Sequence, residues 1–196
     1  MAGARANIKP YPLAEQPAGK LNVTDPDSRN LKTTRGFVQG YNAQAAVTCE
    51  QIVVAAEIST ESLDTANLQP MVETACRELE AVGVAETPDV VLADAGYWRN
   101  DAIEAIVGQG IQTLVAPDAD RRTEPRPGRR GGLYDFARGV LATDWGKELY
   151  LRRQGTVEPV FGQIKSNRTA DRFLRRGRSA VRSLVFTRES AARRAK

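Results

Sequence analysis

The stretch Val90-Val91-Leu92-Ala93-Asp94-Ala95-Gly96-Tyr97 decides the fold class of this chain of 196 residues. Four consecutive apolar residues favour a short strand buried on both faces, and the Asp-Ala-Gly that follows favours a sharp exit from the sheet. Apolar residues then recur at helical spacing behind Asn100, a suitable N-cap, and residues 111–116 return to an apolar run. Strand, helix and strand in this order predict an α/β fold with a parallel pair and a right-handed crossover.

Upstream of this unit, the sequence predicts a helix and a hairpin. Apolar residues at steps of three and four predict a helix over residues 65–82, and Gly83 is a stop signal. Residues 37–47 and 51–58 have strand character and are separated by a short polar turn, which predicts an antiparallel hairpin. Residues 1–35 are rich in proline, glycine and polar side chains, so we expect an extended lead-in.

Downstream, the sequence becomes basic. Residues 117–132 hold three prolines, three glycines and five arginines, which predicts a mobile basic loop that does not pack into a core. Helical spacing returns over residues 147–166. We therefore expect one globular domain over residues 36–168, followed by a basic tail over residues 169–196.

The composition limits the chemistry of the chain. It has no histidine, which excludes Ser-His-Asp and Cys-His catalysis and any histidine-ligated metal. Cys49 and Cys76 lack CxxC partners, so we expect both to be small core residues. Any metal must then be held by carboxylates, which suit Mg²⁺ or Mn²⁺. No membrane span or secretory leader is predicted, so we expect a cytoplasmic protein.

Charge is distributed unevenly along the chain. Residues 121–196 carry 20 Lys and Arg against 7 Asp and Glu, a balance of +13, whereas residues 1–120 carry 8 against 17, a balance of −9. An acidic body joined to a basic C-terminal part is typical of a protein that holds cations in one region and phosphates in another. A solvated basic tail without a ligand would give the same balance.

Asp94 and Glu158 are the two candidate chemical residues. Asp94 follows a buried parallel strand, where ligand sites form in open α/β sheets, although aspartate is also a common turn former. Glu158 shares one side of its helix with Gly162 and Lys165, so the glutamate could bind a metal and the lysine a DNA phosphate. An exposed helical glutamate without a function is the alternative.

Three stretches together resemble the DDE-type transposases of bacterial insertion sequences. They are TDPDSRNLKTTRGFVQGYNAQAAV (24–47), ADAGYW (93–98) and YLRRQGTVEPVFGQIKSNR (150–168), and the likeness covers roughly residues 20–180. The resemblance implies a ribonuclease H-like mixed sheet flanked by helices. It also implies that three carboxylates hold two Mg²⁺ or Mn²⁺ ions during strand cleavage and transfer.

The same resemblance assigns roles to individual residues. Asp94, which precedes a glycine and an aromatic residue, matches the second carboxylate, and Glu158 matches the third. Lys165 completes the family's pattern of glutamate, six residues and lysine. Tyr150, Arg153 and Arg168 would contact DNA or position the helix. The implied partner is the DNA at the ends of an element, bound in the cytoplasmic nucleoid by a homo-oligomer.

Two departures from the family's pattern affect this interpretation. Gln154 stands where the family has arginine, with Arg153 one residue earlier. The first catalytic aspartate belongs to a strand ahead of the hairpin, and no such strand is predicted. Asp25 and Asp27 lie in a proline-flanked loop, and Asp64 is expected to start a helix. We therefore expect a fold that lacks its first strand, and a truncated or frameshifted copy.

Two other functions remain open at this point. A non-catalytic DNA-binding remnant would account for the basic C-terminal part and for the missing ligand. An α/β phosphatase or hydrolase with Asp94 as nucleophile would account for the end of the buried strand.

Overall fold

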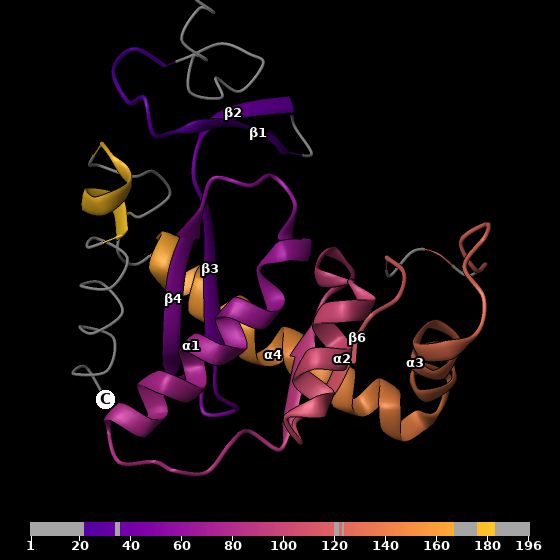
Figure 1. The fold of residues 1–196 in the computed structure, drawn as a ribbon. Helices are drawn as coiled ribbons and strands as arrows, with labels where there is room; N and C mark the ends of the chain where they lie inside the picture. The colour runs from indigo at the N-terminus through magenta and orange to yellow at the C-terminus, as the bar shows by residue number, and fades with distance from the viewer. Residues whose placement is uncertain (1–21, 34–35, 120–121, 123, 167–175, 183–196) are drawn as a thin grey trace, which may run out of the picture.

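The computed structural model describes residues 22–33, 36–119, 122, 124–166 and 176–182 (Figure 1). In this part of the chain, strands and helices form a mixed α/β fold in which the strands pair two by two: β1 with β2, β3 with β4, and β5 with β6. The elements are β1 (Arg29–Thr33), β2 (Gly36–Gly40), β3 (Asn42–Val47), β4 (Val53–Ser59), η1 (Asp64–Ala66), α1 (Leu68–Ala81), β5 (Val90–Ala93), η2 (Ala95–Tyr97), α2 (Asn100–Gly108), β6 (Gln112–Val115), α3 (Gly132–Ala142) and α4 (Asp144–Ser166).

The predicted hairpin is confirmed, with a shorter first strand. β3 and β4 are antiparallel, with Ala45 opposite Ala56. Residues 36–40 do not extend β3. They form the separate strand β2, which pairs with β1 inside the expected lead-in. The prediction of an extended lead-in is therefore wrong for residues 29–33, which form β1. Gly36 begins β2 with a φ of +120°, a conformation that glycine tolerates.

Helices cover both faces of the hairpin. On one face, Met71 and Ala75 of α1 pack against Ala55, and on the other Val160 of α4 packs against Val53 and Ala56. Figure 1 shows α1 in front of β3 and β4, with α4 passing behind them. The predicted helix over residues 65–82 is confirmed as η1 and α1. α1 ends at Ala81, and Gly83 follows two residues later with a φ of +86° and an N–H that donates to the carbonyl of Glu80.

The predicted parallel pair is also confirmed. β5 and β6 are parallel, with Val90 opposite Gln112 and Ala93 opposite Val115. The prediction that Asn100 caps α2 is wrong. Arg99 occupies the cap position, and the carboxylate of Asp101 accepts bonds from the Ala102 N–H at 2.9 Å and from the Arg99 guanidinium at 2.7 Å. The carboxylate of Asp101 in the first turn of α2 therefore accepts the N–H bond that the side chain of Asn100 was predicted to accept.

The largest core lies where α1, α2, α3 and the parallel pair meet. Trp98 packs edge-on against Tyr134 of α3, with ring centroids 5.9 Å apart. The sequence did not predict α3. The other buried residues of this core are Leu68, Val72, Ala93, Ile103, Ile106, Ile111, Leu114, Val115 and Ala137. Because Leu68 and Val72 belong to α1, this helix joins the hairpin to the parallel pair.

A tight corner connects α3 to α4. The hydroxyl of Thr143 accepts a bond from the Gly146 N–H at 3.0 Å, as an N-cap does. A Cβ on Gly146 would lie 2.0 Å from the carbonyl oxygen of Val140, so only glycine fits. α4 begins at Asp144, three residues before the predicted start, and runs to Ser166 as predicted.

Residues 176–182, which lie in the expected basic tail, pack onto the hairpin. Val181 is fully buried against Tyr41 and Ile58. Asp25 accepts bonds from the Tyr41 hydroxyl at 2.7 Å and from the Gly177 N–H at 3.2 Å. Asp25 thus joins the segment that precedes β1 to a segment about 150 positions later.

The two cysteines differ in their surroundings. Cys76 lies on α1, half-buried against the core, as expected. Cys49 is exposed, so its predicted core position is wrong, because it lies in the turn between β3 and β4. Among the described residues, the structure contains no helix with the length and apolar character needed to cross a membrane.

Candidate active site

Asp94 begins the site, directly after β5. Its backbone is extended, and its Oδ1 accepts a bond from the Gly96 N–H at 2.8 Å, so Asp94 caps the single turn η2. The side chain is half-buried. The turn-forming role is therefore real, yet it uses one oxygen of the carboxylate, and no partner of Oδ2 is seen in the described part of the chain.

A second carboxylate, Asp64 of η1, lies beside Asp94. A Cβ built on Gly96 would lie 3.0 Å from Asp94 Oδ1 and 3.2 Å from Asp64 Oδ2, so these two oxygens are at most about 6.2 Å apart. Glycine at position 96 leaves this space open. Asp64 starts a helical turn, as predicted, but its closeness to Asp94 was not predicted. Its place just after a hairpin strand was the available signal.

Amide side chains of β3 hold Asp64 in this position. Asn42 and Gln44 point to the same side of the strand and donate to Asp64 Oδ1 at 2.6 and 2.8 Å. The buried Gln44 also accepts a bond from the hydroxyl of Tyr97. The polar residues of the GYNAQ motif therefore connect β3 to η1 and η2.

Tyr97 is the point where the strands and α4 meet. Burial is the main reason that the pKa of its hydroxyl is raised, and the negative charges of Asp64 and Asp94 raise it further. The positive charge of Arg153 acts in the opposite direction, which places this α4 residue near the same hydroxyl. Tyr97 therefore stays protonated and donates to Gln44.

Two of the sequence-predicted residues on α4 pack against each other. The guanidinium of Arg153 lies over the ring of Tyr150, 5.1 Å from its centroid, which is a cation–π geometry. The Nε of Arg153 is buried and has no hydrogen-bond partner among the described residues. Of the predicted site residues, the structure thus brings Asp94 and Arg153 to the surroundings of Tyr97, with Tyr150 against Arg153.

Glu158 is exposed on α4, one position before Pro159. Proline has no N–H to bond the carbonyl of Gly155 one turn earlier, and that carbonyl accepts a bond from the Gln51 side chain at 3.1 Å. The turn between β3 and β4 therefore fixes the turn of α4 that carries Glu158.

The remaining predicted DNA-binding residues are only partly described. Lys165 lies within α4, but its side chain is outside what the structure describes. Arg168 lies outside the described residues altogether.

The described residues do not assemble the three-carboxylate site that the resemblance implies. Across residues 22–33, 36–119, 122, 124–166 and 176–182, no three Asp, Glu, Cys or His side chains come together as metal ligands. Asp94 and Asp64 have the oxygen chemistry that Mg²⁺ prefers, but Glu158 is not gathered with them. This arrangement does not fit a two-metal centre, so we derive no reaction step through a metal.

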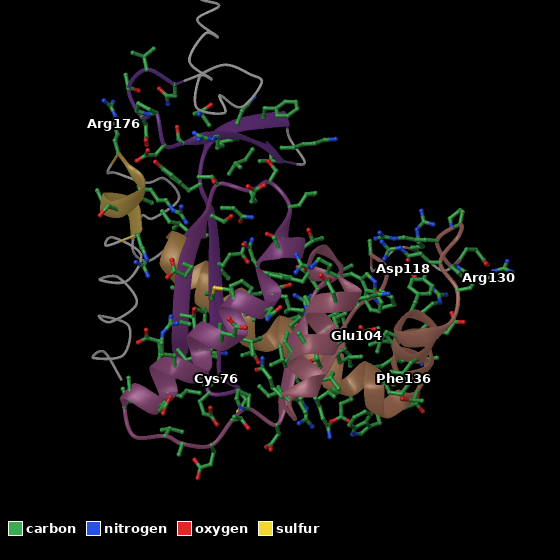
Figure 2. The ribbon with its side chains drawn as sticks, in the orientation of Figure 1. Cys76, Glu104, Asp118, Arg130, Phe136 and Arg176 are labelled. Carbon is green, nitrogen blue, oxygen red and sulfur yellow. The ribbon has the colours of Figure 1, made fainter. Side chains whose placement is uncertain are left out.

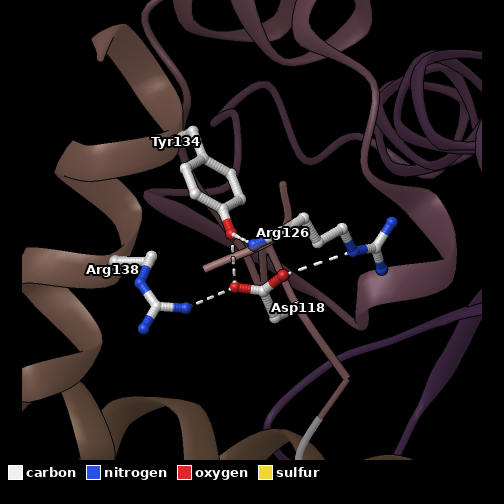
Figure 3. Close-up of polar contacts among 4 residues, drawn as sticks. All are labelled: Asp118, Arg126, Tyr134 and Arg138. Atoms are coloured by element: carbon white, nitrogen blue, oxygen red, sulfur yellow. Dashed lines mark hydrogen bonds and ion pairs between the residues drawn. The ribbon is translucent and has the colours of Figure 1, made fainter. Parts of the chain in front are cut away.

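A second polar cluster surrounds Asp118, three residues after β6 (Figure 3). Its Oδ2 accepts bonds from the Tyr134 hydroxyl at 2.7 Å and from the Arg138 guanidinium at 2.5 Å. Its Oδ1 lies 3.2 Å from the Nε of Arg126. Burial opposes ionisation, but the bonds from Tyr134 and Arg138 and the two positive charges outweigh it and lower the pKa of Asp118.

This cluster corrects the prediction for residues 117–132. Asp118 is only 7% exposed, and the hydroxyl of Tyr134 also accepts a bond from the Arg126 N–H at 2.8 Å. The loop is therefore tied to the core at one buried carboxylate. The prolines and arginines of this segment predicted a mobile loop, and nothing in the sequence indicated that Asp118 would attach it to the core.

A cavity of about 390 Å³ lies between α2, β6, α3 and α4. No charged side chain lines it; its walls include Trp98, Phe136 and Trp145. Phosphoryl chemistry needs charged or metal-binding groups, so this cavity is not the active site.

Comparison with known proteins gives one match. The model of the family described as "Transposase DDE domain" matches residues 18–192. No curated protein and no solved structure matches the chain.

Proposed function

Because the chain belongs to the transposase DDE-domain family, we propose that it is a DNA transposase chain whose candidate catalytic edge is the carboxyl end of β5. The observation that carries this proposal is Asp94, a half-buried carboxylate with one oxygen free, at the edge where α/β proteins bind ligands. The substrate would be the phosphodiester backbone at the ends of a mobile element, bound by a homo-oligomer in the nucleoid.

Mg²⁺ or Mn²⁺ is the proposed cofactor, because carboxylates are ligands that these ions prefer. Asp94 and Glu158 would both be its ligands only in a state that brings Glu158 to the β5 edge, since Glu158 is exposed and not gathered with Asp94 among the described residues. Such a metal stabilises the charge that develops during phosphoryl transfer. Lys165, Arg153, Tyr150 and Arg168 would contact or position the DNA. The ribonuclease H-like sheet, without its first strand, belongs to this proposal too.

We further propose that the chain alone has little cleavage activity. Two carboxylates meet at the β5 edge where the family mechanism needs three, and Glu158 faces solvent elsewhere. DNA binding by the arginines of the C-terminal part does not depend on the metal site. A non-catalytic DNA-binding remnant is the second candidate, and the same observation favours it.

Nicking of supercoiled plasmid DNA tests both candidates. Purified chain is incubated with plasmid in Mg²⁺, Mn²⁺ or EDTA, alongside the Asp94→Asn and Glu158→Gln variants, and binding is measured on the same samples. We expect salt-dependent binding in EDTA and weak or no nicking. Any nicking by the wild type should need the metal and should fall by about 10³-fold in either variant.

Each other outcome is informative. Nicking that survives Asp94→Asn would place the chemistry elsewhere and contradict the assignment. Binding that is indifferent to metal and to both substitutions, without nicking, would establish the non-catalytic alternative. Absence of DNA binding at low salt would overturn both candidates. Turnover of small phosphate esters that is lost in Asp94→Asn would instead favour a hydrolase.

A further inference from the structure

The described residues between β6 and α3 (117–119, 122 and 124–131), here called the arginine loop, leave the molecule at the edge that carries Asp94. β5 and β6 are parallel and in register, with Ala93 opposite Val115. Asp94 follows β5 by one residue and Asp118 follows β6 by three, so both lie beyond the carboxyl ends of neighbouring strands. Figure 2 shows Asp118 near the base of the loop and Arg130 at its outer side.

Asp118 braces two arginines at the base of this loop. Its side chain is 6% exposed, whereas those of Arg126 and Arg138 are 37% and 28% exposed. Arg126 is held twice, through its side chain and through its N–H bond to Tyr134. Both guanidiniums are thereby fixed at one end, while part of each still faces solvent.

The arginine loop carries positive charge that its carboxylates do not neutralise. One buried carboxylate faces two guanidiniums, which leaves the braced cluster with a charge of +1. Within the described residues, Arg122, Arg129 and Arg130 form no ion pair. Arg129 is half-buried, and its Nη1 is buried without a hydrogen-bond partner there.

We propose that the arginine loop, braced by Asp118, binds the backbone phosphates of the DNA strand that passes Asp94. Guanidiniums match phosphate oxygens in bidentate geometry, and a fixed guanidinium loses less side-chain entropy when it binds. The contacts are to phosphates, so they would position DNA without reading its sequence. The identity of the polyanion as DNA rests on the proposed transposase function.

The slope of log affinity against log salt concentration tests this site. The probe is a fluorescent mixed-sequence duplex of about 30 base pairs, titrated in EDTA so that no catalysis intervenes. The Arg129→Gln/Arg130→Gln variant should lose about 1.8 from the magnitude of the slope, because each phosphate contact contributes about 0.9. The matched control, Lys32→Gln/Arg77→Gln, removes the same charge from β1 and α1, which lie away from the loop in Figure 1.

The outcomes separate this proposal from the proposed function. Equal slopes for the loop variant and the control, with normal wild-type binding, would overturn the loop site and leave the transposase function standing. A wild type that does not bind the duplex at any salt concentration would overturn the proposed function and the loop site together.

The effect of Asp118→Asn on DNA affinity has opposite signs under two explanations, net charge and positioning of the arginines. Removal of a negative charge should strengthen DNA binding if net charge alone mattered. If Asp118 positions the guanidiniums of Arg126 and Arg138, binding should instead weaken severalfold although the protein is more positive. Binding as tight as the wild type or tighter would overturn the bracing role, and the Arg129→Gln/Arg130→Gln variant keeps the site testable if Asp118→Asn does not fold.

Discussion

Asp94 and Asp118 follow neighbouring parallel strands at one edge of the same sheet, yet their surroundings differ. Asp118 is buried. Its Oδ2 accepts hydrogen bonds from Tyr134 and Arg138, and its Oδ1 forms an ion pair with Arg126 at 3.2 Å but has no hydrogen-bond partner among the described residues. Asp94 is half-buried and accepts one bond, from a backbone N–H two residues away. No arginine forms an ion pair with it in the described part of the chain.

This difference separates a structural carboxylate from a chemical one. A buried carboxylate that two guanidiniums already neutralise is not available to a metal ion, and its loss leaves those guanidiniums without their counter-charge. A carboxylate with one free oxygen beside a glycine can still accept a metal ion or a proton. The position after a parallel strand therefore does not identify a catalytic residue until its partners are known.

The largest expected effect is on stability. Asp118→Asn should lower the free energy of unfolding by about 2–3 kcal/mol, because the amide keeps only one acceptor oxygen and no longer neutralises Arg138 and Arg126. The cost stays below that of a fully buried ion pair because both arginines are partly exposed. Urea denaturation at pH 7 measures it.

Asp94→Asn is the matched control for that measurement. It changes the same functional group at the same sheet edge, and asparagine is as good a helix cap as aspartate, so we expect a change within about 0.5 kcal/mol. Equal losses for the two variants would remove the distinction between the two carboxylates.

Acid should reduce the first of these effects. The pKa of Asp118 is lower in the folded chain than the usual value of about 3.9, so its contribution is present above that pH. The contribution is lost as the pH falls through the lowered folded pKa. The difference in unfolding free energy between wild type and Asp118→Asn should be equal at pH 7 and 5 and smaller near pH 3. A constant difference down to the lowest pH at which both fold would show that the charge of Asp118 does not stabilise the fold.

The sequence predicts the elements better than the contacts between them. Periodicity alone was sufficient for the hairpin, α1, the parallel pair and most of α4, because a single buried face sets each pattern. It failed at β1 and merged β2 with β3, because the side chains of β1 and β2 are mostly exposed and give no apolar alternation. It also failed at α3, which follows directly on a segment rich in arginine and glycine.

The site shows the same limit. Asp94 could be singled out because an apolar strand precedes it and a glycine follows two residues later. The strand is less buried than predicted, since only Ala93 of β5 is fully buried. Asp64 could not be joined to it, since that contact depends on Gln44 and Asn42, 20 and 22 positions away. Asp118 has the same local signal as Asp94, and only the arginines that fold back from residues 126 and 138 reveal its role. Contacts at long sequence separation are set by packing, which local patterns do not encode.

A smaller effect than that of Asp118→Asn concerns Glu158, the proposed third carboxylate, through the bond that fixes its turn of α4. Gln51→Ala should cost about 0.5–1 kcal/mol, because the Gly155 carbonyl loses the donor that stands in for the N–H missing at Pro159. In a Pro159→Ala background the restored N–H can bond Gly155, so the same substitution should cost less. Gln51 has a φ of +63°, and any strain that alanine adds there is common to both backgrounds and cancels in the cycle. Equal costs in the two backgrounds would mean that Pro159 does not create the acceptor, and that the hairpin turn does not hold Glu158 in place.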